Sequence, residues 1–170
     1  QMCIRDRFNN SMQFLFVTHH RQHMPENFYP KTKIIMTSRE KVDWLEIIDA
    51  EAKEFQPDLV GISVMFGASF ESAQMVGQHI RKEYPGTIIV SGGVHVTGVV
   101  NEKNHGLEFN DFIIIKESEK HFPQLVKYLN GEIDLVNGVI PIKTNKVRKK
   151  ENFTGITDPI EHVDELPIPD

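Results

Sequence analysis

Short apolar runs alternate with segments of helical periodicity from residue 32 to residue 131, and this alternation constrains the fold more than any other feature. The apolar runs span residues 32–38, 59–66, 87–91 and 111–116. The helical segments span residues 39–55, 69–86 and 118–131. Because strands that alternate with helices are joined by right-handed crossovers, the pattern predicts an α/β domain with a parallel sheet and flanking helices.

Each helical segment ends at a residue that helices do not continue through. Pro57 lies just beyond the first segment, Pro85 and Gly86 close the second, and Gly131 closes the third. Proline lacks the backbone N–H that a helix needs, and glycine readily adopts the left-handed conformation that caps one. The run at 59–66 is apolar at nearly every position, which is typical of a strand covered on both faces.

Residues 11–26 admit two interpretations. As a helix, the segment has Ser11 as its N-cap, apolar residues on one face and Pro25 just beyond its end. As a strand, residues 13–18 would be followed by roughly 15 residues without a recognisable crossover helix, which is unusual in a compact domain. We favour the helix, and we then expect the first strand of the sheet to be missing from this chain.

The rest of the chain sets the expected domain limits. Residues 1–10 resemble translated adaptor sequence, so we expect an artefact or disorder there. The α/β domain is expected over residues 11–131. Residues 132–157 contain two short strand-like stretches around KTNK and predict an appended β-hairpin. The proline-rich residues 158–170 predict a truncated linker toward a further domain.

Charge and composition exclude several classes of function. The formal net charge is −5 with both signs interspersed, which argues against a nucleic-acid partner. No apolar run approaches the roughly 20 residues that cross a bilayer, so we expect no membrane association and a cytoplasmic protein. The single cysteine, Cys3, excludes an internal disulfide or an iron–sulfur cluster held by this chain alone.

Distinctive residues follow three of the predicted strands, at the edge where ligands of open parallel sheets bind. Ser63 and Gly67 follow the first, and Gly92 and Gly93 follow the second. The third is followed by residues 116–122. Adjacent glycines allow either a sharp turn alone or the close approach of a bulky ligand to the backbone, and local chemistry leaves both open.

Other chemistries have weaker support. Neither G-x-G-x-x-G nor G-x-x-x-x-G-K-[ST] occurs, so the usual phosphate cradles are absent from the sequence. Ser63 lacks the G-x-S-x-G context of a hydrolase nucleophile. His19, His20 and His23 have metal-compatible spacing on a helix, although a solvated polar face explains them better.

Four stretches, PDLVGIS, IIVSGGVHVT, DFIIIKESEKHF and DPIEHVDELPIPD, resemble in order and spacing the cobalamin-binding domain of cobalamin-dependent radical S-adenosylmethionine enzymes. The resemblance covers about residues 32–170. It implies a flavodoxin-like (Rossmann-like) sheet, with the corrin ring across the strand ends and the nucleotide tail in a slot beside the sheet. The implied cofactor-binding residues are Ser63, Val64, Met65, Gly67, Ser91, Gly92, Gly93, His95, Thr97, Glu117 and Ser118.

Within the resemblance, particular roles are implied. Ser63 occupies the position whose hydroxyl bonds the base of the tail, and Gly92 and Gly93 clear the wall of the slot. His95 and Thr97 would lie at the ring edge, although a structural role for His95 in the loop is an equal alternative.

The chain also departs from the family pattern. Residues 116–119 read Lys-Glu-Ser-Glu where the family usually has Gly-Glu-Gly-Glu, so the backbone freedom of those glycines is lost. The D-x-H-x-x-G motif that supplies a lower axial histidine in methionine synthase-like domains is absent. Many family members bind cobalamin without that ligand; if residues 13–18 form a strand, His20 is the remaining candidate for it.

Radical chemistry requires a 4Fe-4S cluster and S-adenosylmethionine, which the family binds in a barrel after this domain. We therefore expect the chain to bind the corrinoid and present it to its own C-terminal radical barrel for methyl transfer or ring-forming chemistry, without catalysis by itself. Two alternatives remain: a flavodoxin-like regulatory or interaction domain without cofactor, and a domain of a nucleotide-sugar-using enzyme.

Overall fold

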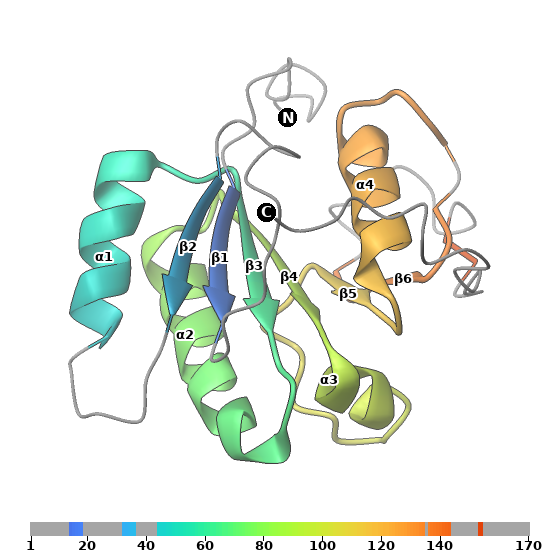
Figure 1. Ribbon diagram of the computed structural model, residues 1–170, viewed down its shortest axis with the longest axis horizontal. Coiled ribbons are helices and arrows are strands. Elements are labelled where there is room, and N and C mark those ends of the chain that lie inside the picture. The colour runs from blue at the N-terminus through green and yellow to red at the C-terminus, as the bar shows by residue number, and fades with distance from the viewer. Residues whose placement is uncertain (1–13, 19–31, 37–43, 135, 144–152, 155–170) are drawn as a thin grey trace, which may run out of the picture.

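The computed structural model describes residues 14–18, 32–36, 44–134, 136–143 and 153–154. Strands and helices alternate along most of this length (Figure 1). The strands are β1 (Phe14–Thr18), β2 (Thr32–Met36), β3 (Leu59–Ser63), β4 (Ile88–Gly92), β5 (Phe112–Ile114) and β6 (Val139–Pro141). The helices are α1 (Trp44–Phe55), the 3₁₀ turn η3 (Gly67–Ser69), α2 (Phe70–Glu83), α3 (Val94–Val99) and α4 (Ser118–Leu129).

The strands form one sheet in the order β2-β1-β3-β4-β5-β6. All neighbours are parallel except β5 and β6, which are antiparallel. The predicted α/β fold with a mostly parallel sheet is confirmed, and the order of the first five strands is that of flavodoxin-like sheets. β6 lies in the segment predicted to form a hairpin and pairs with β5. Residues 144–152 of that segment lie outside the described residues, so the hairpin itself stays a prediction.

The favoured helix over residues 11–26 is wrong where the structure describes that segment, and the alternative of a strand there is confirmed. Residues 14–18 form a strand, β1, and not part of a helix. β1 pairs with both β2 and β3, with Phe16 opposite Ile34 on one side and Gly61 on the other. The first strand of the sheet is therefore present. A strand inserted between two neighbours satisfies its backbone on both edges, and this non-local pairing overrides the helical spacing of its apolar residues.

The helices cover the two faces of the sheet with two separate cores. One core joins Val60 and Ile62 of β3 to buried residues of α1, α2 and α3. The other joins Leu59 of the same strand to Phe122 and Leu125 of α4. Because successive side chains of a strand point to opposite faces, residue parity along β3 decides which core each side chain enters.

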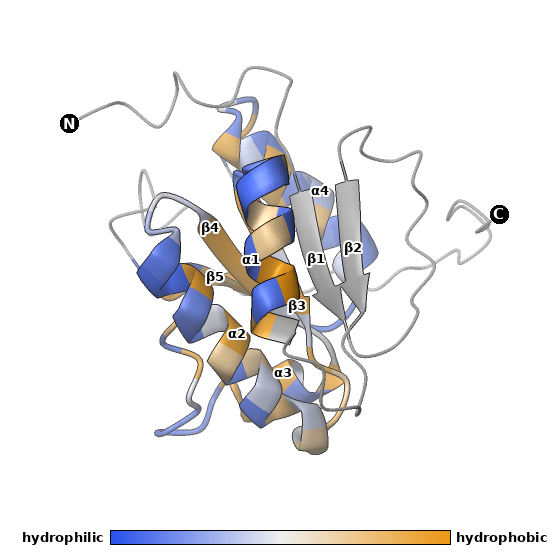
Figure 2. Cartoon of the chain, turned by 90° about the vertical axis from the view of Figure 1, so that its left-hand side faces the viewer, coloured by the Kyte–Doolittle hydropathy of each residue, from blue (hydrophilic) through white to orange (hydrophobic). Residues whose placement is uncertain are grey.

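Hydropathy follows this layering. Figure 2 shows that β3, β4 and β5 are hydrophobic along most of their length, whereas α1 and α2 mix hydrophilic and hydrophobic residues. Such mixing is expected of helices that bury one face only. Within the part of the chain that the structure describes, no helix combines the length and apolarity required to cross a bilayer.

A polar cluster joins α1 to α2 on the outside of the first core. His79 Nε2 lies 2.8 Å from Asp49 Oδ1, and the Tyr84 hydroxyl donates to the same oxygen at 3.1 Å. The contact with His79 is the main reason that the pKa of Asp49 lies below its ordinary value. The folded chain therefore stabilises the ionised form of the Asp49 carboxyl group more than the unfolded chain does.

This lowered pKa predicts a pH-dependent contribution to stability. A carboxyl group with a lowered folded-state pKa stabilises the fold above its unfolded pKa of about 3.9, and this stabilisation is lost as the pH falls below that value. Asp49→Asn should reduce the free energy of unfolding at pH 7 by less than about 1 kcal/mol, because the cluster is partly exposed. Urea unfolding of both proteins between pH 7 and 3 tests this; a difference that stays constant over that range would contradict it.

Candidate functional site

Three residues at the carboxyl ends of neighbouring strands form one row, called the edge row: Ser63, Gly92 and Ile114. Ser63 and Gly92 are register partners and are the last residues of β3 and β4. A Cβ on Gly92 would lie 3.4 Å from the Ile114 carbonyl oxygen at the end of β5. By strand alternation, Ser63 and Gly92 share the sheet face of Leu59, which α4 covers. The edge row therefore has a hydroxyl, a gap without a side chain, and an apolar side chain, in that order.

Ser63 is half-buried, and within the described part of the chain its hydroxyl has no hydrogen-bond partner. The next residue, Val64, is fully buried and points into the opposite core. Its backbone N–H donates to Gly92 O at 2.9 Å, and its carbonyl accepts from His95 N at 3.2 Å. Val64 thus holds the loops after β3 and β4 together, and Met65 follows it half-buried.

The two adjacent glycines have different structural roles. Gly93 has φ +108°, and a Cβ built there would lie 2.5 Å from the Val64 carbonyl oxygen. Backbone packing inside the domain is therefore sufficient to require glycine at Gly93. A Cβ on Gly92 would make only ordinary contacts, so of the pair Gly92 is the one whose missing side chain leaves room for a ligand.

The segment after the glycines, expected to be a loop, is the short helix α3. His95 lies in it, half-buried, with its ring 4.8 Å from the ring of Phe70 at the start of α2. A Cβ on Gly67 would lie 3.6 Å from the His95 ring. The structure thus brings Gly67 and His95 together. His95 packs the beginning of α2 against α3. This contact fits the structural role that the sequence left open as an alternative for His95.

Thr97 links α3 to the loop after β5. Its hydroxyl donates to Gly93 O at 3.1 Å and accepts from Lys116 N at 2.9 Å. The side chain that was expected at the ring edge is therefore engaged in holding two loops of the site together. Glu117 and Ser118 follow Lys116 and begin α4, with Glu117 exposed and Ser118 half-buried.

Lys116 stands where the family pattern has glycine, and its backbone adopts a conformation that favours that residue. Its φ is +57°, in the left-handed region that favours glycine. The left-handed conformation therefore occurs at a residue that adopts it only at a cost. The left-handed conformation costs a residue with a Cβ about 1–2 kcal/mol.

This strain predicts a stabilising substitution. Lys116→Gly should raise the free energy of unfolding by up to about 1 kcal/mol, because the relieved strain exceeds the extra entropy of glycine in the unfolded chain. Glu117 has φ −79° and ψ 113°, which any residue adopts, so Glu117→Gly is the matched control and should destabilise. Thermal unfolding of both variants decides the matter; equal effects at the two positions would contradict it.

Ser91 differs from its neighbours because its side chain is not available to a ligand. It is fully buried, and its hydroxyl donates to Asn110 Oδ1 at 2.7 Å. Asn110 in turn donates from its amide to Leu107 O at 3.0 Å. Sequence reasoning missed this pair, because a single Asn at the start of an apolar run carries no signal that a serine 19 residues earlier is its partner.

His121, within the predicted site segment 116–122, is also buried away from any ligand. It is fully buried, and neither ring nitrogen has a hydrogen-bond partner among the described residues. It packs against Gly138, whose φ of +62° and lack of a Cβ make room for the ring. No three metal-binding side chains of the described residues are grouped closely enough to hold an ion, and His20 lies outside those residues.

Burial without partners predicts that His121 destabilises the fold. A buried polar group without a hydrogen bond costs about 1–3 kcal/mol, so His121→Leu should raise the free energy of unfolding by about 1–2 kcal/mol. His105→Leu is the control, because His105 Nδ1 accepts a hydrogen bond from Leu107 N at 3.0 Å, and its loss should not stabilise the protein. Urea unfolding at pH 7 measures both; a destabilised His121→Leu variant would overturn the prediction.

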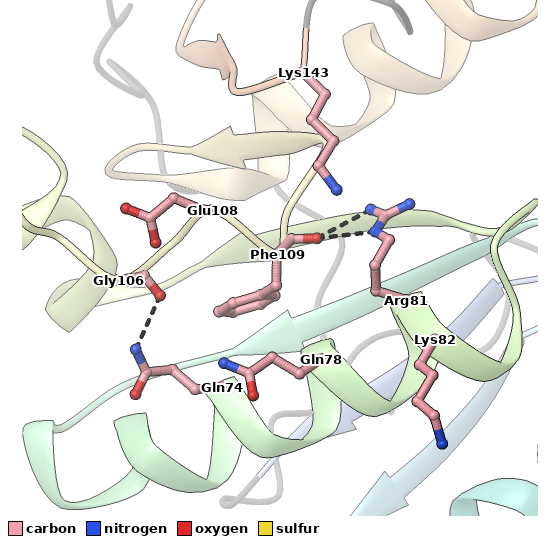
Figure 3. A pocket seen from close by; sticks show the side chains of 8 residues that line it. All are labelled: Gln74, Gln78, Arg81, Lys82, Gly106, Glu108, Phe109 and Lys143. Carbon is pink, nitrogen blue, oxygen red and sulfur yellow. Dashed lines mark hydrogen bonds between the residues drawn. The ribbon is translucent and has the colours of Figure 1, made fainter.

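A cavity of about 390 Å³ lies elsewhere, along α2 (Figure 3). Arg81 donates to the Phe109 carbonyl at its wall, and Gln74 donates to the Gly106 carbonyl. The lining residues are Gln74, Gln78, Arg81, Lys82, Gly106, Glu108, Phe109 and Lys143. Because α2 covers the sheet face opposite α4, this cavity is separate from the edge row.

Comparison with known proteins identifies the family. The family model described as "B12 binding domain" matches residues 33–126. OxsB, a cobalamin-dependent S-adenosylmethionine radical enzyme, has been solved with aqua-cobalamin and S-adenosylmethionine bound. That structure has a TM-score of 0.62 and 20% identity, covering 94% of this chain and 24% of its own.

The apo, selenomethionine-labelled form of OxsB gives a TM-score of 0.58 at 19% identity, with the same coverage. At such identities the likeness establishes the fold, and this chain spans about a quarter of the OxsB chain. A search of curated protein sequences found no significant match. Because the family model covers more than half of the chain, including β3, β4, β5 and most of α4, this protein belongs to the family of B12 binding domains.

Proposed function

We propose that this chain binds cobalamin at the carboxyl edge of its sheet and presents it to the catalytic barrel of a radical S-adenosylmethionine enzyme. The observation that carries the proposal is the edge row. Ser63 offers a half-buried hydroxyl without a partner among the described residues, directly beside the side-chain gap at Gly92.

The edge row suits the base of the nucleotide tail. A flat heteroaromatic base needs apolar walls and a hydrogen-bond donor for its ring nitrogen, because an unpaired buried nitrogen is costly. The Ser63 hydroxyl is such a donor, and neighbouring strands lie about 4.8 Å apart, so the gap at Gly92 is one strand away. Ile114 and the apolar core under α4 supply the wall.

Two large apolar side chains beyond the strand ends suit the corrin ring. Phe66 is 58% exposed in the loop after β3, and Val94 is 67% exposed at the start of α3. Phe66 and Val94 follow the carboxyl ends of two neighbouring strands, where ligands of open parallel sheets bind. When bound, cobalamin supplies a cobalt centre for methyl transfer or radical chemistry, and the residues of this edge bind and orient it.

The partner domain and the reaction are inferred from the likeness to OxsB. The family assignment suggests cobalamin as the ligand, and the OxsB fold match extends over nearly all of this chain. We infer that a radical barrel, with its 4Fe-4S cluster and S-adenosylmethionine, acts with this domain. Methyl transfer and ring-forming chemistry are both compatible with such a barrel, whose residues decide between them.

Cobalamin binding by the purified chain tests the proposal. We expect the wild-type chain to retain hydroxocobalamin through desalting and to shift its absorbance spectrum. Ser63→Ala should weaken binding several-fold, and Gly92→Val should abolish it by filling the gap in the edge row. Matched controls are Ser72→Ala on α2 and Gly98→Val, since no atom lies within 4 Å of a Cβ on Gly98. A folded wild-type chain that retains no cobalamin would overturn the proposal.

A further inference from the structure

We propose that Lys116 binds the phosphodiester of the corrinoid's nucleotide tail, and so selects complete corrinoids over those that lack the tail. This inference rests on the proposed function and names a contact within the same site. Its starting point is the left-handed backbone of Lys116, with φ +57°, where glycine would be free of strain. Strained residues persist where the surrounding structure holds them, and such positions cluster at ligand sites.

Hydrogen bonds place Lys116 at the rim of the edge row. Its backbone N–H donates to Thr97 Oγ1 at 2.9 Å, and Thr97 Oγ1 donates to Gly93 O at 3.1 Å. Lys116 also lies two residues after Ile114, whose carbonyl is 3.4 Å from the position of a Cβ on Gly92. The backbone of Lys116 is therefore connected to the surroundings of Gly92 in two ways, through the Thr97 side chain of α3 and through the end of β5.

The side chain of Lys116 is exposed and has no partner of opposite charge among the described residues. By contrast, Arg81 pairs with Asp111 at 2.6 Å, and Lys82 pairs with Glu83 at 2.7 Å. A lysine ammonium is a compact charge on a flexible stem, which suits an anion that approaches from solvent.

The chemistry of the ligand supplies the matching anion. The nucleotide tail of cobalamin carries one phosphodiester, with a fixed negative charge, between the base and the ring. If the base lies at Ser63 and Gly92 and the ring lies beyond the strand ends, the phosphodiester crosses the rim between them. Hydrogen bonds between ionised partners are shorter and stronger than neutral ones, so a lysine there adds affinity that a glycine cannot.

Binding of two corrinoids to four variants tests the inference. The probes are hydroxocobalamin, which has the phosphodiester, and dicyanocobinamide, which lacks the whole nucleotide tail. We expect Lys116→Met and Lys116→Gly to weaken cobalamin binding about 10-fold, and Lys116→Arg to stay within about 3-fold of wild type. Lys127→Met is the control, because Lys127 is exposed in the last turn of α4, away from the edge row. The same variants should bind dicyanocobinamide with wild-type affinity.

Further measurements distinguish an electrostatic contribution of Lys116 to binding from a purely structural role of this residue. The wild-type affinity for cobalamin should fall with rising salt more steeply than that of Lys116→Met. Lys116→Gly relieves the backbone strain and removes the charge, so a purely structural lysine would let this variant bind as well as wild type. That result, or equal losses for both corrinoids, would overturn the inference. A wild-type chain that binds neither corrinoid would overturn the proposed function and the inference together.

Discussion

Gly93→Ala is expected to destabilise the protein by more than about 3 kcal/mol. The φ of +108° is a conformation that residues with a Cβ rarely adopt, and the new methyl group would lie 2.5 Å from Val64 O. Val64 cannot move aside easily, because its N–H donates to Gly92 O and its carbonyl accepts from His95 N. Urea unfolding at pH 7, monitored by far-UV circular dichroism, measures the loss.

The control for this substitution is Gly98→Ala on α3. No atom lies within 4 Å of a Cβ on Gly98, and alanine favours a helix over glycine, so this variant should gain up to about 1 kcal/mol. A Gly93→Ala variant within about 1 kcal/mol of wild type would show that the loop after β4 adapts. Backbone packing would then no longer explain why the second residue of the pair is glycine.

Arg81→Met is expected to cost about 3–5 kcal/mol, because it leaves a buried carboxylate without its partner. Asp111 is fully buried and directly precedes β5. Its Oδ2 accepts from Arg81 at 2.6 Å and from the Ile89 N–H at 2.9 Å. Its carbonyl also accepts from Ile142 N at 2.8 Å. The ion pair therefore ties α2 to β4, β5 and the segment after β6.

A second ion pair provides the comparison. Lys82 and Glu83 lie 2.7 Å apart, but the Lys82 side chain is 81% exposed, so Lys82→Met should change stability by less than about 1 kcal/mol. The double variant Arg81→Met, Asp111→Asn should recover part of the loss, because no buried charge then remains unpaired. Equal losses for Arg81→Met and Lys82→Met would contradict the buried role of the first pair.

Substitutions at the two adjacent glycines test different properties, the stability of the fold at Gly93 and ligand binding at Gly92. Because the backbone packing around Gly93 requires glycine, we expect a variant there to lose any ligand through unfolding, so such a variant would not test the site. Gly92 has only ordinary contacts around the position of a Cβ, which makes it the informative position for binding. Lys116→Gly is informative for a related reason, since we expect it to raise stability while it lowers affinity.

The differences between the sequence predictions and the structure have a common physical origin. The apolar spacing of β1 fits a helix, whereas its pairing with β2 and β3 depends on partners distant in sequence. The α3 helix has only six residues, too few for a periodic signal. A lysine at position 116 does not by itself predict a positive φ, and only the structure shows this conformation and the hydrogen bond from Lys116 N to Thr97 Oγ1 that accompanies it.

By itself, the sequence determined the α/β class, the alternation of β3, β4 and β5 with α2 and α4, and which residues lie at the carboxyl ends of β3 and β4. These features follow from the spacing of apolar residues and from the positions of proline and glycine. Both signals involve only a few neighbouring residues, so they can be recognised in the sequence alone. Only the tertiary structure decided that Gly92 and Ser63 share one row, that Gly93 serves the fold, and that Asp111 binds Arg81. Such contacts arise from strand register and from which face each side chain takes, and residues far apart in the chain set both.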